Sequence, residues 1–357
     1  MSDPQQLEIV VRGPNWLGDL VMSTPGLRSL RKGFPHARIT LQVRPGLEDL
    51  LKGSTLIDQI QPVQSYHKGM GAMWAEAQRQ RKDGRFDLGI CLPDSFSSAL
   101  LMKLSGVGKV VGYARSGRTF LLDQAVRPSL TSGKSQWVAR EKHVLDLMLA
   151  LECPEAGTHL SLPVLDSDKA SVRQILKSHG VAFMQADSVA LAPGASFGSS
   201  KCWPVEHFAR VGDALSAAGA RIFLVGSANE SKLTGDVKAA MSSPSVDLAG
   251  ALSIGELKAL IQSMNLVIAN DAGSRHIATA LGVPSIIFFG STSVEKTPLN
   301  LETVRVFERT LECRPCYKRV CPIPGHPCLS AIEPEPVFDA ALAVLQGRGS
   351  PLDSGAA

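Results

Sequence analysis

The sequence predicts an α/β protein built from two doubly wound, parallel-sheet domains that meet near residue 165. Three observations support this fold class. The chain has 357 residues, which suits about two domains at roughly 150 residues each. Short runs that are apolar throughout alternate with helical patterns, as expected for parallel strands covered on both faces. A stretch broken by Pro154, Gly157 and Pro163 separates the two halves.

The first half opens with a β-loop-α unit. A strand is predicted over residues 7–11, then a loop rich in Gly, Pro and Asn over 13–18, then a helix over 19–32. Further elements follow less regularly: strands over 38–43 and 87–92, and a helix over 137–152.

The second half alternates regularly after a helix over 168–179 that ends before Gly180. The predicted strands cover 188–192, 221–225, 266–269 and 285–289, and the predicted helices cover 204–218, 227–241, 253–263 and 273–281. We therefore expect an N-terminal domain over 1–165, a C-terminal domain over 166–334, a last helix over 335–346 and a disordered tail over 347–357.

Composition excludes several classes of protein. Hydrophobic residues make up 44% of the chain and charged residues 20%, which excludes wholesale disorder. The net charge of +4 is too small for a dedicated nucleic-acid binder. The sequence contains neither an apolar run of about 18 residues nor a signal-peptide pattern at its start. We therefore expect a cytoplasmic protein whose cysteines are mostly reduced.

Ligands of open α/β sheets bind beyond the carboxyl ends of the strands, so polar residues just after strands are candidate site residues. The first such loop runs from Arg12 to Asp19, and its glycines let the backbone approach a ligand closely. Asp19 has two interpretations. It either caps the following helix, worth about 1 kcal/mol, or presents a carboxylate that takes a proton from a hydroxyl.

The second loop runs from Pro193 to Pro204 and contains one lysine, Lys201. Small, hydroxyl-bearing residues beside a helix start and a point positive charge suit a phosphate group. The loop lacks the Gly-Lys-Ser/Thr spacing of a Walker A motif. An ordinary surface loop with a solvated lysine is the alternative.

The third loop runs from Asn270 to His276, directly after an apolar strand. Gly273 allows close backbone approach, and the N-terminus of the following helix offers free N–H groups. His276 either projects toward the same opening or is an ordinary helix histidine. Together the second and third loops predict a nucleotide diphosphate held without an obligatory metal.

Basic residues gather between Leu101 and Lys142. Eight lysines and arginines face two acidic residues there, a local net charge of +6. The region is either a solvated basic surface or a site for an anionic partner, and such a face can also hold a protein against an anionic membrane. The eight are Lys103, Lys109, Arg115, Arg118, Arg127, Lys134, Arg140 and Lys142.

Four of the seven cysteines cluster near the end of the chain, with His326 among them. Their spacing could ligate zinc or another thiophilic metal as a structural site, and reduced thiols or a disulfide are the alternatives. The four are Cys313, Cys316, Cys321 and Cys328.

Three motifs carry a resemblance that covers residues 7–346: RGPNWLGDLVMSTP, PGASFGSSKCWP and NDAGSRHIATALGVPSIIFFGST. The chain resembles the ADP-heptose:lipopolysaccharide heptosyltransferases of glycosyltransferase family 9. The Asn-Trp-Leu-Gly-Asp form of the first motif is most similar to the branch that adds the second heptose of the inner core.

The resemblance implies the GT-B fold, in which two Rossmann-like domains face each other across a cleft. The N-terminal domain would take the lipopolysaccharide core acceptor, heptosyl-Kdo2-lipid A, and the C-terminal domain would take ADP-heptose. The reaction would invert the anomeric centre in one displacement, with Asp19 as the base and no required cofactor.

The resemblance also assigns binding residues. For the donor these are Ser196, Lys201, Glu230, Asp271, Ala272, Gly273 and His276, with residues 246–250 beside the adenine. Glu230 would bond the ribose, and a surface glutamate is its alternative. Ala272 stands where the family usually has serine, so one hydroxyl is missing. For the acceptor the residues are Asn15, Trp16, Arg115 and Arg118.

Several alternatives stay open. A first-heptose enzyme or another family 9 sugar transferase would share these motifs. A GT-B-like nucleotide-sugar epimerase would need other acid and base carboxylates, and a non-catalytic binding protein would not need Asp19. We expect no nucleic-acid partner and, for the basic region, peripheral contact with the inner face of the inner membrane.

Overall fold

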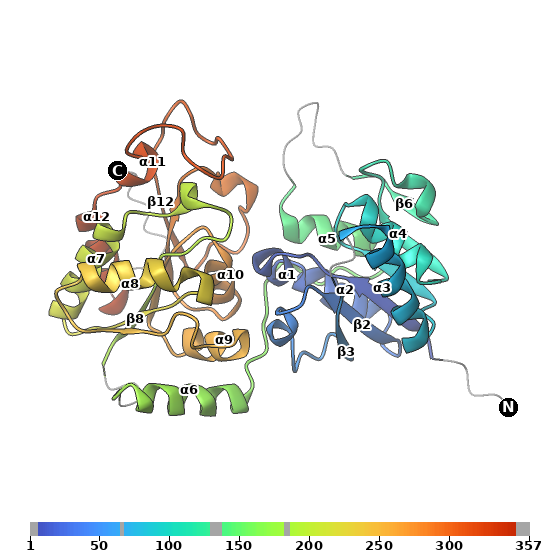
Figure 1. Ribbon diagram of the computed structural model, residues 1–357, viewed down its shortest axis with the longest axis horizontal. Helices are drawn as coiled ribbons and strands as arrows, with labels where there is room; N and C mark the ends of the chain where they lie inside the picture. The colour runs from blue at the N-terminus through green and yellow to red at the C-terminus, as the bar shows by residue number, and fades with distance from the viewer. Residues whose placement is uncertain (1–5, 65–67, 129–137, 182–185, 348–357) are drawn as a thin grey trace. The chain divides into compact units, whose positions relative to one another are not determined.

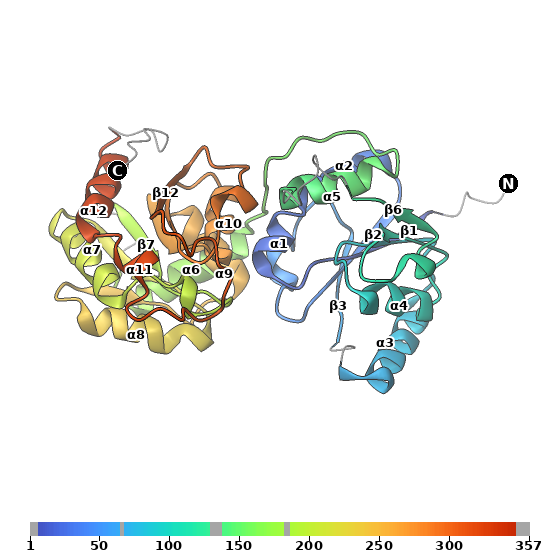
Figure 2. The ribbon, with the colours of Figure 1, turned by 90° about the horizontal axis from the view of Figure 1, so that it is seen from above.

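The computed structural model describes residues 6–64, 68–128, 138–181 and 186–347. The chain divides into two compact units, Met1–Pro163 and Val164–Ala357, close to the boundary predicted near residue 165. Each unit is a parallel sheet with helices on both faces (Figures 1 and 2). The predicted α/β, doubly wound fold class is confirmed.

The sheet of the first unit has the order β3-β2-β1-β4-β5-β6, and all its strand pairs are parallel. Ile9 on the central strand lies opposite Ile39 on one side and Leu88 on the other, and all three are buried. The strands are β1 (Glu8–Arg12), β2 (Arg38–Val43), β3 (Gln59–Pro62), β4 (Leu88–Cys91), β5 (Lys109–Tyr113) and β6 (Gln124–Val126).

Helices α2 and α5 pack together over this sheet, and α3 packs against α4 on the other face (Figure 2). A Cβ on Gly26 of α2 would lie 2.4 Å from Val144 Cγ1 of α5, so only glycine permits this close approach. The helices are α1 (Leu17–Val21), α2 (Thr24–Gly33), α3 (Met70–Asp83), α4 (Phe96–Leu104) and α5 (Arg140–Leu149).

The helix predicted over 19–32 is wrong as one element, because α1 ends at Val21 and α2 begins at Thr24. Pro25 has no N–H to donate to the Val21 carbonyl, and the Thr24 hydroxyl donates to that carbonyl at 2.8 Å instead. The break ends α1 after five residues and keeps it short beside the first candidate loop.

The sheet of the second unit has the order β12-β11-β10-β7-β8-β9, again fully parallel. Counted within each unit, both sheets follow the Rossmann order 3-2-1-4-5-6. The strands are β7 (Ser188–Ala192), β8 (Arg221–Leu224), β9 (Ser245–Asp247), β10 (Leu266–Asn270), β11 (Ser285–Phe289) and β12 (Val304–Glu308).

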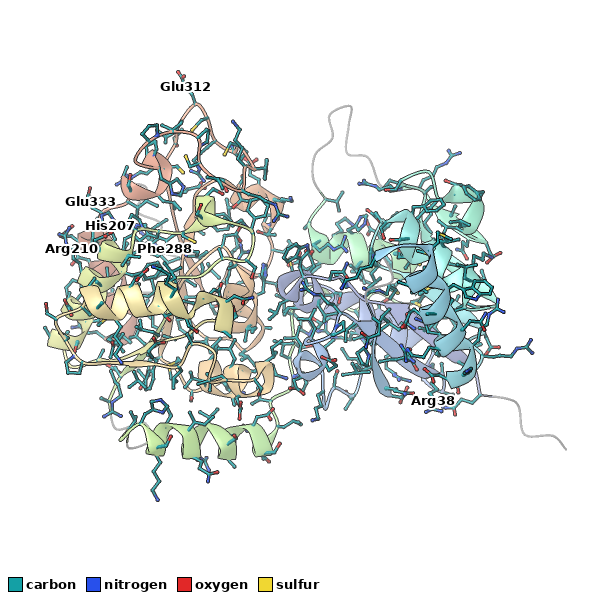
Figure 3. All side chains as sticks on the ribbon, in the orientation of Figure 1. Arg38, His207, Arg210, Phe288, Glu312 and Glu333 are labelled. Carbon is teal, nitrogen blue, oxygen red and sulfur yellow. The ribbon has the colours of Figure 1, made fainter. Side chains whose placement is uncertain are left out.

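Trp203 organises the core of the second unit and is almost fully buried. Its indole stacks on Phe288 at 4.2 Å between ring centroids, and its Nε1–H donates to the Ile332 carbonyl at 3.0 Å (Figure 3 labels Phe288). The helices are α6 (Asp166–Ser178), α7 (Val205–Ala217), α8 (Ser231–Ala240), α9 (Ile254–Gln262), α10 (Gly273–Ala280), α11 (Pro327–Ser330) and α12 (Pro334–Leu345).

The predicted tail beyond Gly347 lies outside the described residues. Within the described ranges, none of the helices combines the length and the apolar character that crossing a membrane requires.

Candidate active site

The second unit gathers its candidate residues where the strand order reverses. β7 lies between β10 and β8, so the loops after β7 and β10 leave neighbouring strands at the same edge of the sheet. Such a switch point is where doubly wound sheets bind ligands. Lys201 ends a short 3-10 helix after β7, and Asp271 directly follows β10.

Lys201 and Asp271 form the centre of this site. The Lys201 ammonium donates to Asp271 Oδ2 at 2.6 Å and to the Asp271 carbonyl at 2.9 Å. Arg275 Nη1 donates to Asp271 Oδ1 at 2.8 Å, and the Thr292 hydroxyl donates to Oδ2 at 2.8 Å. The structure therefore brings together the predicted donor residues Lys201 and Asp271, and adds Arg275 and Thr292 beside them.

Burial and charge set the protonation states in this cluster. Burial alone would raise the pKa of the Asp271 carboxyl, but the Arg275 and Lys201 cations outweigh it and hold that pKa well below its usual range. Burial, assisted by Arg275, lowers the pKa of His276 to about 3. His276 is therefore neutral at pH 7 and adds no positive charge to the cluster.

Asn270 is a positioning residue that the sequence did not single out. Its buried side chain donates to the Pro193 carbonyl at 2.7 Å and accepts from the Trp203 N–H at 3.0 Å. These two bonds fix both ends of the loop that carries Lys201. A polar side chain at the last position of a buried strand was the available signal.

The remaining predicted donor residues lie around the same loops. Glu230 accepts from the N–H and hydroxyl of Ser227 at 2.7 and 2.8 Å, and its other oxygen lies against Gly194. Glu230 therefore has a local capping role, and its other oxygen reaches the loop after β7. Ser196 is exposed on that loop, and Ala272 and Gly273 begin α10.

The segment that contains the four clustered cysteines, residues 313–328 (the cysteine segment), is hydrogen-bonded to the loop that carries Lys201. The four predicted metal ligands and His326 line one pocket together with Ser200. Ser200 N–H donates to the Arg319 carbonyl at 3.1 Å, its hydroxyl donates to the Lys318 carbonyl, and His326 Nε2 lies 3.0 Å from the Ser200 carbonyl.

The predicted structural metal site does not form in this arrangement. Across the described ranges, no three His, Cys, Asp or Glu side chains converge closely enough to hold a metal ion. The thiols of Cys313, Cys316, Cys321 and Cys328 are free. Burial raises the pKa of the Cys328 thiol.

In the first unit, Asp19 lies in the first turn of α1, after the carboxyl end of β1. Trp16 is the N-cap residue, and no side chain caps this helix, so the interpretation of Asp19 as a cap is wrong. The carboxylate is partly exposed and makes no hydrogen bond or ion pair with the described parts of the chain. It is therefore available to a substrate.

Arg12 shapes the loop that leads to Asp19, and the sequence did not predict this role. Its buried guanidinium donates to the Gly13 carbonyl at 2.5 Å, to the Gln42 carbonyl at 3.2 Å and to the side chain of Asn15. Asn15 is thus held in place, while Trp16 stays 46% exposed.

The two predicted acceptor arginines differ. Arg118 has no exposed surface and donates to the carbonyls of Tyr113 and Ser95, both at 3.0 Å. It therefore holds the loops after β4 and β5 instead of facing solvent. Arg115 is exposed and lies 3.9 Å from Asp94. Burial alone would raise the pKa of the Asp94 carboxyl, but the contact with His143 and the nearby arginines lower it below its usual value.

The basic region is less charged toward solvent than its sequence suggests. Lys103 pairs with Asp123 at 2.6 Å and Lys142 pairs with Asp146 at 3.0 Å. Lys134 lies outside the described residues. Lys109 and Arg127 are exposed and make no ion pair among the residues that the structure covers.

The family model of glycosyltransferase family 9 (heptosyltransferase) matches residues 74–326, which is most of the chain. The chain belongs to glycosyltransferase family 9. It is therefore an enzyme, a glycosyltransferase. Ala272 stands where serine was expected for this family. It is the N-cap residue of α10 and has no hydroxyl, so this position can offer a ligand only backbone groups.

Two curated relatives of this family 9 chain match nearly its whole length. A lipopolysaccharide heptosyltransferase 2 of Salmonella typhimurium is 25% identical over 96% of this chain and 100% of the relative. A protein of the same name from Escherichia coli is 27% identical over 95% and 99%.

Solved structures show the same fold. The ADP-heptose lipopolysaccharide heptosyltransferase II of E. coli has a TM-score of 0.79 at 24% identity, covering 96% of this chain and 99% of that one. A family 9 glycosyltransferase of Veillonella parvula has a TM-score of 0.81 at 21% identity, covering 96% and 97%. The family 9 chain thus has the expected GT-B fold.

Proposed function

We propose that this family 9 glycosyltransferase transfers heptose from ADP-L-glycero-D-manno-heptose to the heptosyl-Kdo2-lipid A inner core of lipopolysaccharide. The names of the full-length relatives support this substrate pair. The free carboxylate of Asp19 carries the catalytic part of the proposal, because a direct displacement needs one base for the acceptor hydroxyl.

In the proposed reaction, an acceptor hydroxyl oxygen attacks the anomeric carbon of the heptose. Its proton passes to the Asp19 carboxylate as the new C–O bond forms. The bond between the anomeric carbon and the phosphate oxygen breaks on the opposite face, so ADP leaves and the configuration inverts. Asp19 suits this task because the described residues leave its oxygens without a hydrogen-bond donor.

The departing ADP gains negative charge, and the donor site supplies groups for it. The Lys201 ammonium and the backbone N–H groups at the start of α10 are the proposed partners of the diphosphate. Ser196 and neutral His276 add hydrogen bonds, and Glu230 and residues 246–250 contact the nucleoside. These tasks fall to protein groups, so we expect a chelator to leave turnover unchanged.

For the acceptor we propose Asn15, Trp16 and Arg115 as contacts, with Arg118 holding the loop beneath Arg115. Kdo carboxylates and lipid A phosphates are anionic, which matches an exposed arginine. Arg127 follows β6 at the same edge of the sheet as Arg115 and extends this basic surface. We propose that this surface favours peripheral contact of a cytoplasmic enzyme with the inner membrane, at about 1 kcal/mol for each basic residue near the surface.

The test is transfer itself. The protein is incubated with ADP-heptose and a purified core that carries one heptose, and mass spectrometry detects one added heptose. A core without heptose is the second acceptor, and preference for it would indicate a first-heptose enzyme. No transfer to either core would remove the proposal.

Variants test the residue roles. We expect Asp19→Asn to abolish transfer while ADP-heptose affinity is kept, because only the base is lost. Asp166→Asn is the matched control, since Asp166 is 95% exposed and, among the residues that the structure describes, its ion pair is with Lys169 on its own helix. Normal turnover by the Asp19 variant would refute the base assignment.

A further inference from the structure

Arg275 is a buried cation beside the proposed phosphate site. It lies on α10 and is 2% exposed. Besides its bond to Asp271, its Nη1 and Nη2 each lie 3.1 Å from Thr297 Oγ1. Its guanidinium carbon lies 5.1 Å from the centroid of the Phe289 ring. The side chain is thus fixed from three directions.

The cluster around Asp271 carries more positive than negative charge. Lys201 and Arg275 both contact the single carboxylate of Asp271, at 2.6 and 2.8 Å. His276 adds no charge at pH 7, because burial lowers its pKa to about 3. The three charged side chains therefore sum to one surplus positive charge in a buried place, which is costly unless an anion balances it.

Lys201 alone could not supply that surplus. An ammonium has three N–H donors, and Lys201 uses two of them on Asp271. If Arg275 were absent, Lys201 and Asp271 would form a neutral pair. A phosphate approaching Lys201 would then compete with a carboxylate that has no other cation.

We propose that Arg275 is a positioning residue that neutralises Asp271 and so leaves the charge of Lys201 available to the diphosphate of the donor. This inference rests on the proposed function, in which Lys201 contacts the donor phosphates. Arg275 would then determine the affinity for the diphosphate without touching it. Its own contacts are with Asp271, Thr297 and Phe289.

The experiment compares ADP, AMP and adenosine, with affinities measured by calorimetry. In Arg275→Met we expect ADP affinity to fall about tenfold or more, because a charge-assisted contact weakens. AMP affinity falls less, and adenosine affinity does not change. Arg275→Lys restores most of the ADP affinity because it restores the charge. Arg275→Gln replaces the Met variant should that variant fail to fold.

A double variant that restores the net charge of the cluster tests the proposal more directly. Asp271→Asn in the Arg275→Met background returns the cluster to one surplus positive charge, so this double variant should bind ADP more tightly than Arg275→Met alone. A purely structural role for Arg275 predicts further loss instead. The matched control is Arg210→Met, because Arg210 (labelled in Figure 3) is an exposed arginine of the same unit. It pairs with Glu335.

Two outcomes would overturn the inference. One is unchanged ADP affinity in Arg275→Met. The other is an equal loss for ADP, AMP and adenosine, which would indicate general damage to the site. Lys201→Ala separates this failure from that of the proposed function: unchanged ADP affinity in that variant would remove the donor assignment itself.

Discussion

Gly198 offers a direct test of how the loop after β7 is held. It has φ of +150°, and a Cβ there would lie 2.2 Å from the Arg319 carbonyl oxygen of the cysteine segment. Because that neighbour is backbone, the two segments must separate in Gly198→Ala. The Ser200 N–H bond to the same carbonyl, at 3.1 Å, is then lost.

The expected cost has two parts. Backbone strain at positive φ costs about 1–3 kcal/mol, and a buried N–H left without its acceptor costs about 1–3 kcal/mol more. Gly219→Ala isolates the first part, since Gly219 has φ of +96° and open space around its missing Cβ. The difference between the variants should therefore be about 1–3 kcal/mol, the cost of the lost bond.

Urea denaturation measures this difference, with equal slopes required for a fair comparison. ADP affinity is the second readout, because separation of the segments also displaces Lys201. We expect Gly198→Ala to lose both stability and ADP affinity, and Gly219→Ala to lose only stability. Equal midpoints for the two variants would refute the clash, and intact ADP affinity in Gly198→Ala would refute the link to Lys201.

Three further predictions follow from the same site. Asn270→Ala should cost about 2–3 kcal/mol of stability and weaken ADP binding, measured by denaturation and calorimetry, because two buried bonds are lost. Asn270→Asp should lose at least as much, because it would bury a carboxylate against the Pro193 carbonyl oxygen. Burial lowers the pKa of His276 in the folded protein to about 3, whereas in the unfolded chain it is about 6.5. Below pH about 6.5 the unfolded chain therefore binds a proton that the folded protein does not. The free energy of unfolding should then fall toward acid by up to about 1.4 kcal/mol per pH unit. Replacement by Gln should flatten a denaturation series over that range, and an unchanged slope would contradict a buried neutral imidazole. A thiol reagent followed by mass spectrometry should label exposed Cys313 first and Cys91, whose pKa burial raises to about 11, last; the reverse order would contradict the burial of Cys91.

The sequence predicted most of the central strands of both sheets because their residues are nearly all apolar. β7, β10 and β11 are buried at every position, which is the pattern that the periodicity argument detects. Five strands were missed. β3 and β6, with the sequences QIQP and QAV, are polar and form the two edges of the first sheet, and β9 and β12 form the two edges of the second. β5, with the sequence KVVGY, is neither polar nor at an edge, and it was missed although four of its five residues are buried.

The sequence could predict those site residues whose place is set by their position directly after a strand. Lys201 and Asp271 follow β7 and β10 and meet because those strands pair. The supporting residues depend on packing that no local pattern encodes. Arg118 belongs to a basic run in the sequence, yet it is fully buried, and Arg275 reads as an ordinary helix residue until its contacts with Asp271 and Thr297 are known.

The hydrogen bonds between Ser200 and the cysteine segment can form only after both segments have been synthesised. Ser200 and Lys318 are 118 residues apart, so a ribosome adding about 5–20 residues per second needs about 6–24 s between them. During that interval the first sheet is already complete, while the nascent loop around Lys201 still lacks its outer support. A chain that terminates between residues 309 and 317 would therefore contain Asp19 and the described strands of both sheets, but its nucleotide loop would lack the carbonyls that hold Ser200.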